Sequence, residues 1–269
     1  MSLRGRVFGA YARRRGWAER WLRLHLRLPW SQAKLAWRLY VEAHRRWWTG
    51  LSTPTGDVVA LPIPGSQHGT VYIRPGTTDP LVYYDVLVNE LYGRFIPEGP
   101  ISRVLDLGAN IGLASVFFLS RFPGCRVVAV EPDPQNAAVC RRNLEPFSDR
   151  AVLVQGAVWS EDARLSLLSQ HAGTWASSVD VDPEGQIEGH TIAALIGMLG
   201  GTADIVKIDI EGAEQAILDA PDTSWIDDVR CVAMEPEHIS SLEAFQRAAA
   251  GRMRIVHRYG DVVFASRVT

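Results

Sequence analysis

The sequence predicts an α/β protein built on a doubly wound, mostly parallel β-sheet. Short apolar runs rich in Val and Ile alternate along the chain with segments of helical character, and strands that helices cover on both faces have this continuous apolar pattern. A turn with two glycines directly follows the first of these runs, at the position where such sheets bind ligands. The length of 269 residues and the hydrophobic fraction of 47% allow a large core and argue against global disorder.

Residues 1–52 form a basic extension rich in Arg and Trp, for which we expect helical structure. Ser31 can cap a helix over residues 32–48. Between residues 22 and 28, however, leucines alternate with Arg and His, a pattern that also permits a strand.

The second predicted domain, residues 53–269, begins in a segment typical of turns and short strands, residues 51–69, which contains several prolines and glycines. Continuous apolar runs predict buried strands at residues 104–107, 127–130, 152–155, 205–210 and 229–235. The segments between and after them predict helices at residues 113–122, 135–144, 211–219 and 241–250. A closing antiparallel hairpin around Gly260-Asp261, with strands at residues 254–259 and 262–267, brings the sheet to seven strands.

The small net charge of −2 averages two parts of opposite sign. Residues 1–50 contain 12 basic and 2 acidic residues, a net charge of +10, so the rest of the chain carries −12. An Arg-rich segment interleaved with Trp and Leu fits peripheral contact with an anionic membrane. Nucleic acid is disfavoured as a partner, because the acidic remainder repels phosphates. Two alternatives stay open, since the extension could instead pack on its own domain or on a second subunit of a dimer.

The pattern of cysteines and the short length of the apolar runs predict where in the cell the protein is located. The chain has three cysteines without the spacing of a disulfide framework or a zinc site, Cys125, Cys140 and Cys231, and we expect them to be buried in a protein of a reducing compartment. No uncharged run reaches the roughly 18–20 apolar residues of a spanning helix. Arg13-Arg14-Arg15 lacks the apolar stretch that follows the arginines of an export signal. We therefore expect a cytoplasmic protein, with the inner face of the membrane as a peripheral contact.

The turn after the first strand, from Asp106 to Gly112, lacks part of the glycine pattern that usually binds a pyrophosphate. In a dinucleotide fingerprint counted from Gly108, Asn110 and a leucine stand where the second and third glycines belong. Glu131 ends the next strand, where a carboxylate can accept hydrogen bonds from both hydroxyls of a ribose. The pattern predicts a pocket for a nucleoside without phosphates.

These features resemble a class I methyltransferase, whose cofactor S-adenosylmethionine has a ribose and an adenine but no phosphate. Over approximately residues 70–240 the chain is similar to the FkbM family of methyltransferases, in Ile73–Asp79, Ala157, Thr191-Ile192, Asp204–Glu214 and Ala233–Glu235. The resemblance implies S-adenosylmethionine-dependent O-methylation, with S-adenosylhomocysteine as the product. It also implies cofactor contacts at Asp79, Asp106, Gly108, Asn110, Gly112, Glu131, Pro132 and Ala157.

The resemblance implies an acceptor hydroxyl on a sugar or a natural product. We expect a sugar in a glycan or glycolipid precursor. A small-molecule hydroxyl, as on a polyketide, is the alternative within the same class. A module that holds S-adenosylmethionine without catalysis is the alternative from a different class.

A lysine followed by carboxylates indicates a polar edge of the pocket. Lys207 lies in an apolar strand, where a cation is costly without a partner, and strand alternation puts Asp209 and Glu211 on its face. This group either braces the pocket as ion pairs or lines the site of the methionine moiety or the acceptor. Asp209, Glu211 and Glu235 could together bind a divalent cation, but no further ligand signature accompanies them, and no metal is predicted.

Methylation of a hydroxyl requires a group that accepts its proton. His238 has a suitable intrinsic pKa and follows the fifth strand, although a surface or helix-capping role is equally compatible with its position. The family places a His two residues after the strand-end Glu, whereas Glu237 stands there in this chain. Asp209, Glu211 and Glu235 therefore stay open as alternative bases.

Two further segments could contact ligands. The resemblance implies that Arg74, Thr78 and Asp79 fold over the cofactor, where Asp79 would bind the methionine amino group or the acceptor, or cap a turn. Trp175 could stack on a sugar ring and Trp159 could flank the adenine, although burial in the core is the usual role of Trp.

Overall fold

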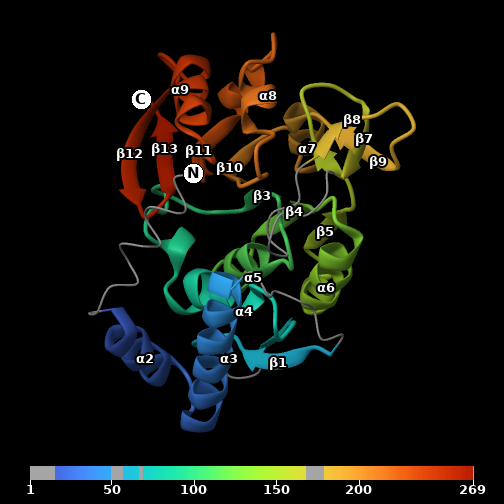
Figure 1. Ribbon diagram of the computed structural model, residues 1–269. Coiled ribbons are helices and arrows are strands. Elements are labelled where there is room, and N and C mark those ends of the chain that lie inside the picture. The colour runs from blue at the N-terminus through green and yellow to red at the C-terminus, as the bar shows by residue number, and fades with distance from the viewer. Residues whose placement is uncertain (1–15, 50–56, 67–68, 168–178, 269) are drawn as a thin grey trace.

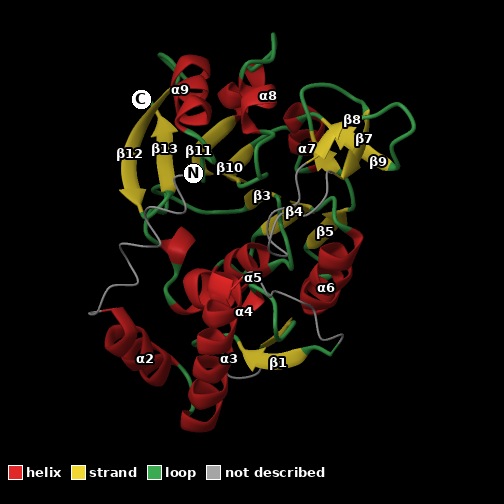
Figure 2. Cartoon of the chain, viewed as in Figure 1, coloured by secondary structure: helices red, strands yellow, loops and turns green. Residues whose placement is uncertain are grey.

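A seven-stranded sheet runs through the protein (Figures 1 and 2), as seen in a computed structural model that describes residues 16–49, 57–66, 69–167 and 179–268. The order of its strands is β12-β13-β11-β10-β3-β4-β5. Their bounds are β3 (Arg103–Leu107), β4 (Arg126–Val130), β5 (Ala151–Val154), β10 (Ala203–Ile208), β11 (Val229–Met234), β12 (Met253–Tyr259) and β13 (Val262–Arg267). Strand β13 pairs antiparallel with both β11 and β12. The other neighbouring strands of this sheet pair parallel. The predicted doubly wound, mostly parallel sheet and its closing hairpin are therefore confirmed.

The chain changes direction across the sheet between β3 and β10. From β3 it builds outward through β4 to β5, and it then returns to pair β10 with the other side of β3, with Ile205 opposite Val104. Ligand sites of open α/β sheets lie beyond the carboxyl ends of the strands at this switch point.

Helices cover both faces of the sheet, because alternate residues of each strand enter two separate cores. Val104 and Leu105 are both fully buried, but they belong to different hydrophobic clusters. The Val104 cluster contains α5 (Leu113–Arg121) and α6 (Pro134–Leu144), and the Leu105 cluster contains α7 (Ile192–Met198), α8 (Glu214–Leu218) and α9 (Ile239–Ala248). Figure 1 shows α5 and α6 on one side of the strands and α8 and α9 on the other. The four predicted helices are present, each within three residues of its expected bounds.

A four-stranded sheet that the sequence did not predict is inserted between β5 and β10. Its strands are β6 (Ala157–Val158), β7 (Arg164–Leu167), β8 (Val179–Val181) and β9 (Ile187–His190). Strands this short show too few alternations for a periodic pattern to reveal them. Residues 168–178, which include the predicted acceptor contact Trp175, lie outside the described residues.

The N-terminal extension is helical and packs onto the domain. It forms α2 (Gly16–Arg27) and α3 (Trp30–Thr49), so the leucine alternation after residue 22 belongs to a helix and not to a strand. Leu24, Leu39 and Tyr40 are almost fully buried in the same cluster as Val104. Among the described residues the extension therefore packs on its own domain. The predicted domain boundary falls in residues 50–56, outside the described ranges.

Short elements connect the extension to the central sheet. They are β1 (Val59–Pro62), β2 (Thr70–Ile73), α4 (Asp79–Tyr83), the π-helical turn η1 (Tyr84–Val88) and the 3-10 turn η2 (Leu91–Gly93); two further 3-10 turns are η3 (Glu145–Phe147) and η4 (Ser224–Asp228). Helix α3 contacts α4, and α2 contacts η1. All three cysteines are buried, as predicted. Within the described ranges, no helix has the length and apolar character needed to cross a bilayer.

The burial of the extension predicts that Leu24→Ala destabilises the whole domain. Leu24 is 1% exposed, and truncation of a buried leucine costs about 2–4 kcal/mol. The matched control is Leu26→Ala on the same helix, because Leu26 is 76% exposed and such surface changes stay within about 0.5 kcal/mol. Urea unfolding followed by tryptophan fluorescence measures both. Equal midpoints for the two variants would show that the extension does not contribute to the core.

Candidate active site

A cavity of about 490 Å³ opens at the switch point. Its inner wall consists of residues that follow the central strands: Gly108, Ala109, Asn110, Glu131, Pro132, Gly156, Ala157, Asp209, Ile210, Glu211 and Glu235. Its outer wall comes from α2, α3, η1, η2 and the β12–β13 turn: Glu19, Arg20, Arg23, Trp47, Tyr84, Asp85, Asn89, Tyr92, Tyr259 and Asp261. The cavity is large enough for a nucleoside cofactor and part of a second molecule.

The glycine turn after β3 is held by backbone hydrogen bonds. The N–H groups of Gly108 and Ala109 both donate to the Val130 carbonyl, at 3.0 and 2.8 Å. Gly108 has a φ of +74°, and a Cβ there would lie 1.8 Å from the Asp209 carbonyl oxygen. Only glycine therefore lets the turn approach the end of β10.

Asn110 and Gly112 in this turn have different structural surroundings. Asn110 adopts a left-handed conformation with a φ of 52°, lines the cavity and has a buried Oδ1 without a hydrogen-bond partner. Gly112 does not line the cavity, and a Cβ there would lie 2.8 Å from Cys140 Sγ on α6. Gly112 therefore permits the packing of α5 against α6, and the structure does not place it at the cavity as the predicted cofactor contact.

Glu131 is the buried carboxylate of the inner wall. It is 4% exposed. Its Oε2 accepts a hydrogen bond from the Asn110 N–H at 2.7 Å, and its Oε1 accepts from the Asp133 N–H at 3.0 Å and from Asn136 Nδ2 at 3.3 Å. Burial raises the pKa of Glu131 to about 7 against the opposing effect of these donors. A carboxylate has about four acceptor positions, so further donors such as ribose hydroxyls can bind.

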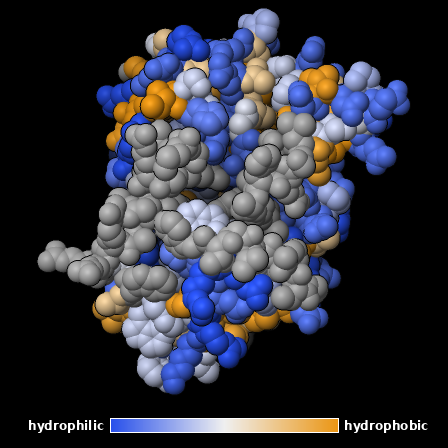
Figure 3. All heavy atoms as spheres, viewed as in Figure 1, coloured by the Kyte–Doolittle hydropathy of each residue, from blue (hydrophilic) through white to orange (hydrophobic). Residues whose placement is uncertain are grey.

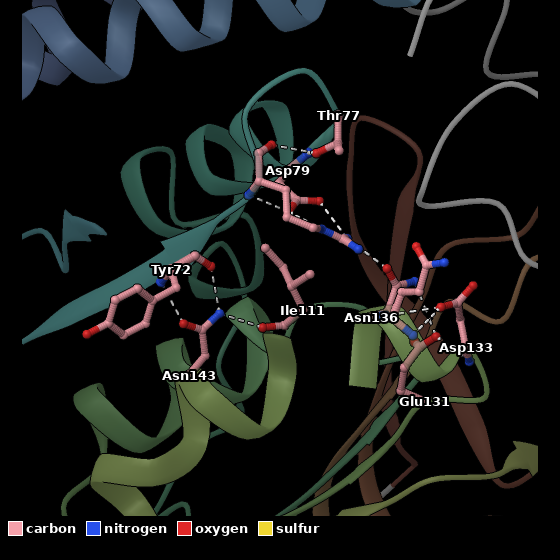
Figure 4. A network of polar contacts seen from close by, with 10 residues as sticks. Tyr72, Thr77, Asp79, Ile111, Glu131, Asp133, Asn136 and Asn143 are labelled. Carbon is pink, nitrogen blue, oxygen red and sulfur yellow. Dashed lines mark hydrogen bonds and ion pairs between the residues drawn. The ribbon is translucent and has the colours of Figure 1, made fainter. Parts of the chain in front are cut away.

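A network of buried polar groups fixes Asn136 behind Glu131 (Figure 4). Arg74 donates to both carboxylate oxygens of Asp79, at 2.9 and 3.0 Å, and its Nη2 also donates to Asn136 Oδ1 at 2.7 Å. Asp79 is fully buried and does not line the cavity. The structure therefore places Asp79 away from the cavity, where it was predicted to contact the cofactor or the acceptor, and Arg74 links it to Asn136 on the cavity wall.

Lys207 lies at the centre of the strand ends and is 3% exposed. Its Nζ is 3.3 Å from Asp106 Oδ1 and 3.7 Å from Asp209 Oδ2, and it donates to the carbonyls of Leu107 and Gly108. Burial lowers the pKa of this lysine, but the two carboxylates outweigh that effect and raise it. The predicted carboxylate partner is therefore confirmed. Asp106 also accepts from Ser115 at 2.6 Å and lies behind the cavity wall rather than in it.

The remaining predicted catalytic residues divide into two groups. Asp209, Glu211 and Glu235 line the cavity. His238 does not, because the chain leaves the sheet after β11 and His238 is exposed at the start of α9. This position disfavours His238 as the base. Trp159 also lies outside the cavity wall.

The structure places no metal centre at the carboxylates of the inner wall. Among the residues described, no three or more His, Cys, Asp or Glu side chains lie together as a metal ion requires.

The outer wall is the part of the site that no sequence pattern predicted. Asn89 links its elements, since its Oδ1 accepts from Arg23 at 2.9 Å and from Arg94 at 2.6 Å, and its Nδ2 donates to the Tyr259 hydroxyl at 3.1 Å. Arg23 and Tyr259 are 66 and 170 residues away from Asn89 along the chain. No local pattern in the sequence marks such contacts.

Residues 106–263 match the sequence profile of the methyltransferase FkbM domain. The chain is similar to the release factor glutamine methyltransferase of Escherichia coli (strain K12), at 26% identity over 151 residues, which cover 55% of this chain and 53% of that protein. A shorter similarity, 37% identity over 68 residues, links it to the 2-O-methyltransferase NoeI of Sinorhizobium fredii (strain NBRC 101917 / NGR234), covering 25% of this chain and 28% of that protein.

Among solved structures, the methyltransferase FkbM from Methylobacillus flagellatus KT superposes with a TM-score of 0.44 at 16% identity, covering 70% of this chain and 53% of that chain. This chain thus spans about half the length of the first of these relatives.

The position of Glu131 predicts that Glu131→Gln weakens S-adenosylmethionine binding. The variant keeps the size of the side chain but removes the charge that the ribose hydroxyls would bind, at a cost of about 2 kcal/mol or roughly 30-fold in affinity. Because a pKa of about 7 leaves the wild-type carboxyl partly protonated at neutral pH, wild-type affinity should fall between pH 8 and pH 6. Isothermal titration calorimetry measures both effects. Unchanged affinity in the variant would remove Glu131 from the cofactor site.

The close approach at Gly108 predicts that Gly108→Ala lowers the free energy of unfolding by at least about 3 kcal/mol. A left-handed backbone and a steric overlap both oppose a Cβ at this position. Gly200→Ala is the matched control, since Gly200 also has a positive φ of +92° but has no atom within 4 Å of the added Cβ. For the control we expect urea unfolding to show a loss of about 1 kcal/mol in the free energy of unfolding, because only the left-handed backbone opposes its Cβ. Equal losses would mean that the contact with Asp209 does not constrain the turn.

Proposed function

The chain belongs to the FkbM family of S-adenosylmethionine-dependent methyltransferases, and from the cavity we propose that it methylates a hydroxyl of a sugar in a glycan or glycolipid precursor. The observation that supports the cofactor part of the proposal is the buried Glu131 beside a turn that lacks the second and third glycines of a dinucleotide fingerprint. The same cavity continues to a second, polar wall, where an acceptor can lie beside the cofactor.

The inner wall fits S-adenosylmethionine, which supplies a methyl group activated by a sulfonium. Glu131 would hold the ribose hydroxyls, and Ala157 with Val158 offers an apolar surface to the adenine. The buried Oδ1 of Asn110, which has no hydrogen-bond partner, offers an acceptor to a donor group of the cofactor. These residues position the cofactor, and positioning is a large part of the catalysis of a displacement on an activated methyl group.

Carboxylates support a polyhydroxylated acceptor. Asp209, Glu211 and Glu235 all line the cavity near the strand ends, and carboxylates are acceptors for the hydroxyl donors of a sugar. The similarity to a 2-O-methyltransferase supports a hydroxyl as the methylated group. A small-molecule hydroxyl is the alternative that the same wall would accept.

The extension supports a membrane-linked acceptor. Leu22, Leu26 and Trp30 are 56%, 76% and 60% exposed, and the Lys34 ammonium lies 4.6 Å from the Trp30 ring. Figure 3 shows hydrophobic and hydrophilic residues side by side at the end of the molecule that α2 and α3 form. Apolar side chains next to cations suit an anionic membrane surface. We include peripheral contact at the cytoplasmic face of a membrane in the proposal.

Methyl-labelled S-adenosylmethionine tests this function. The protein is incubated with tritiated cofactor and an extract of its host cells, and the label is counted in organic, aqueous-glycan and nucleic-acid fractions. We expect label in the glycan or the organic fraction, with the organic fraction identifying a lipid-linked acceptor. The control is the Glu131→Ala variant, which should transfer little label. Label in neither fraction above this control would overturn the proposal and favour a module that only binds the cofactor.

A further inference from the structure

The outer wall of the cavity carries a carboxylate from outside the matched family domain. Asp85 lies on η1, 21 residues before residue 106, where the match begins, and it lines the same cavity as Glu131 and Asp209. The other acidic residue that the N-terminal segments contribute to this wall, Glu19, has a 61% exposed side chain and pairs with Arg23 at 2.7 Å. Asp85 is therefore the partly buried carboxylate of this part of the wall.

The local backbone presents Asp85 to the cavity. The Asn89 N–H donates to the Tyr84 carbonyl at 2.8 Å, five residues back, which makes η1 a turn of π-helix. Single π-turns inside helical segments occur frequently at functional sites. In this turn Asp85 and Asn89 line the cavity, whereas Leu87 and Val88 are buried in the hydrophobic core.

Asp85 interacts electrostatically with titratable groups from three elements, Tyr84 on η1, Tyr40 on α3 and Arg20 on α2. Burial raises the pKa of both tyrosines, so the phenols stay neutral. Burial also raises the pKa of Asp85, to about 6, and the charge of Arg20 opposes this effect. Asp85 is thus mostly ionised at neutral pH, yet it is a stronger base than an exposed aspartate, which suits a general base.

Of the other candidates for this role, two are engaged and one lies outside the cavity, whereas Glu211, Glu235 and Asp261 also line it. Asp209 lies 3.7 Å from Lys207 Nζ, and Glu131 accepts three hydrogen bonds from neighbouring residues. His238 is outside the cavity.

We propose that Asp85 is the general base of the reaction, and that the acceptor binds between the strand ends and the wall formed by α2, α3 and η1. This inference rests on the proposed O-methylation. The acceptor oxygen forms a bond to the methyl carbon while the carbon–sulfur bond breaks, and the electron pair of that bond stays on sulfur. The proton of the hydroxyl passes to a carboxylate oxygen of Asp85 and then to solvent.

The test is Asp85→Asn, measured as the initial rate of methyl transfer to the acceptor fraction identified with labelled S-adenosylmethionine. At saturating cofactor we expect a loss of about 10²-fold or more, the usual contribution of a general base. Cofactor affinity in calorimetry should stay within about 2-fold of wild type, since Asp85 lies on the acceptor side. The matched control is Asp162→Asn, because Asp162 is exposed and does not line the cavity.

The pH dependence separates a catalytic from a structural role. At saturating cofactor, which removes the effect of Glu131 on affinity, the wild-type rate should rise with pH through about 6 and then level off, because only the ionised carboxylate accepts a proton. Arg20→Gln removes the cation that lowers the pKa of Asp85, so this rise should move to higher pH; the variant also serves if Asp85→Asn fails to fold. Carbon-13 NMR of labelled aspartate carboxyls should show a group that titrates near pH 6 in the wild type and is missing in Asp85→Asn.

Two outcomes overturn the inference. Wild-type rates in Asp85→Asn, or a pH profile that Arg20→Gln leaves in place, would exclude Asp85 as the base while the methyltransferase function stands. A wild-type protein that binds S-adenosylmethionine but labels no acceptor would instead defeat the proposed function, and the role of Asp85 would fall with it.

Discussion

The buried ammonium of Lys207 joins the segments on which the site depends. It contacts the carboxylates of Asp106 and Asp209 and the carbonyls of Leu107 and Gly108, so it links β3, its glycine turn and the end of β10. A buried charge without partners costs several kcal/mol, and these contacts require the two strands to end at the same level. The junction therefore fixes the glycine turn against β10, and it keeps Asp106 behind the cavity while Asp209 faces it.

The inner wall was largely predictable because its residues lie in local patterns. Apolar runs locate the strands, and parallel strands bring their carboxyl ends to one edge, so Gly108, Glu131 and Asp209 could be assigned to one pocket from the sequence. Asp79 and His238 were assigned to the same pocket, but their positions depend on side-chain and chain directions that no periodicity encodes. Asp79 forms a buried ion pair with Arg74. His238 lies at the start of α9, where the chain has left the sheet.

The outer wall was not predictable, because tertiary contacts over long sequence separations build it. The composition marked residues 1–50 as a separate, basic segment, and it does not show that Leu24 and Tyr40 enter the core of the methyltransferase domain. Through this packing α2 and α3 meet η1, and Asn89 connects α2 to the end of β12. Residues that precede the matched family domain thus form part of the cavity wall.

Cofactor and acceptor would share one cavity, with the acceptor between the strand ends and the wall formed by α2, α3 and η1. A crystal structure of the protein with S-adenosylhomocysteine tests this arrangement most directly. We expect both ribose hydroxyls at hydrogen-bond distance from the Glu131 carboxylate, about 2.5–3.0 Å, with the sulfur directed toward the wall that carries Asp85. A ribose bound away from Glu131 would remove Glu131 from the cofactor site, and a sulfur directed away from the outer wall would exclude an acceptor bound beside Asp85.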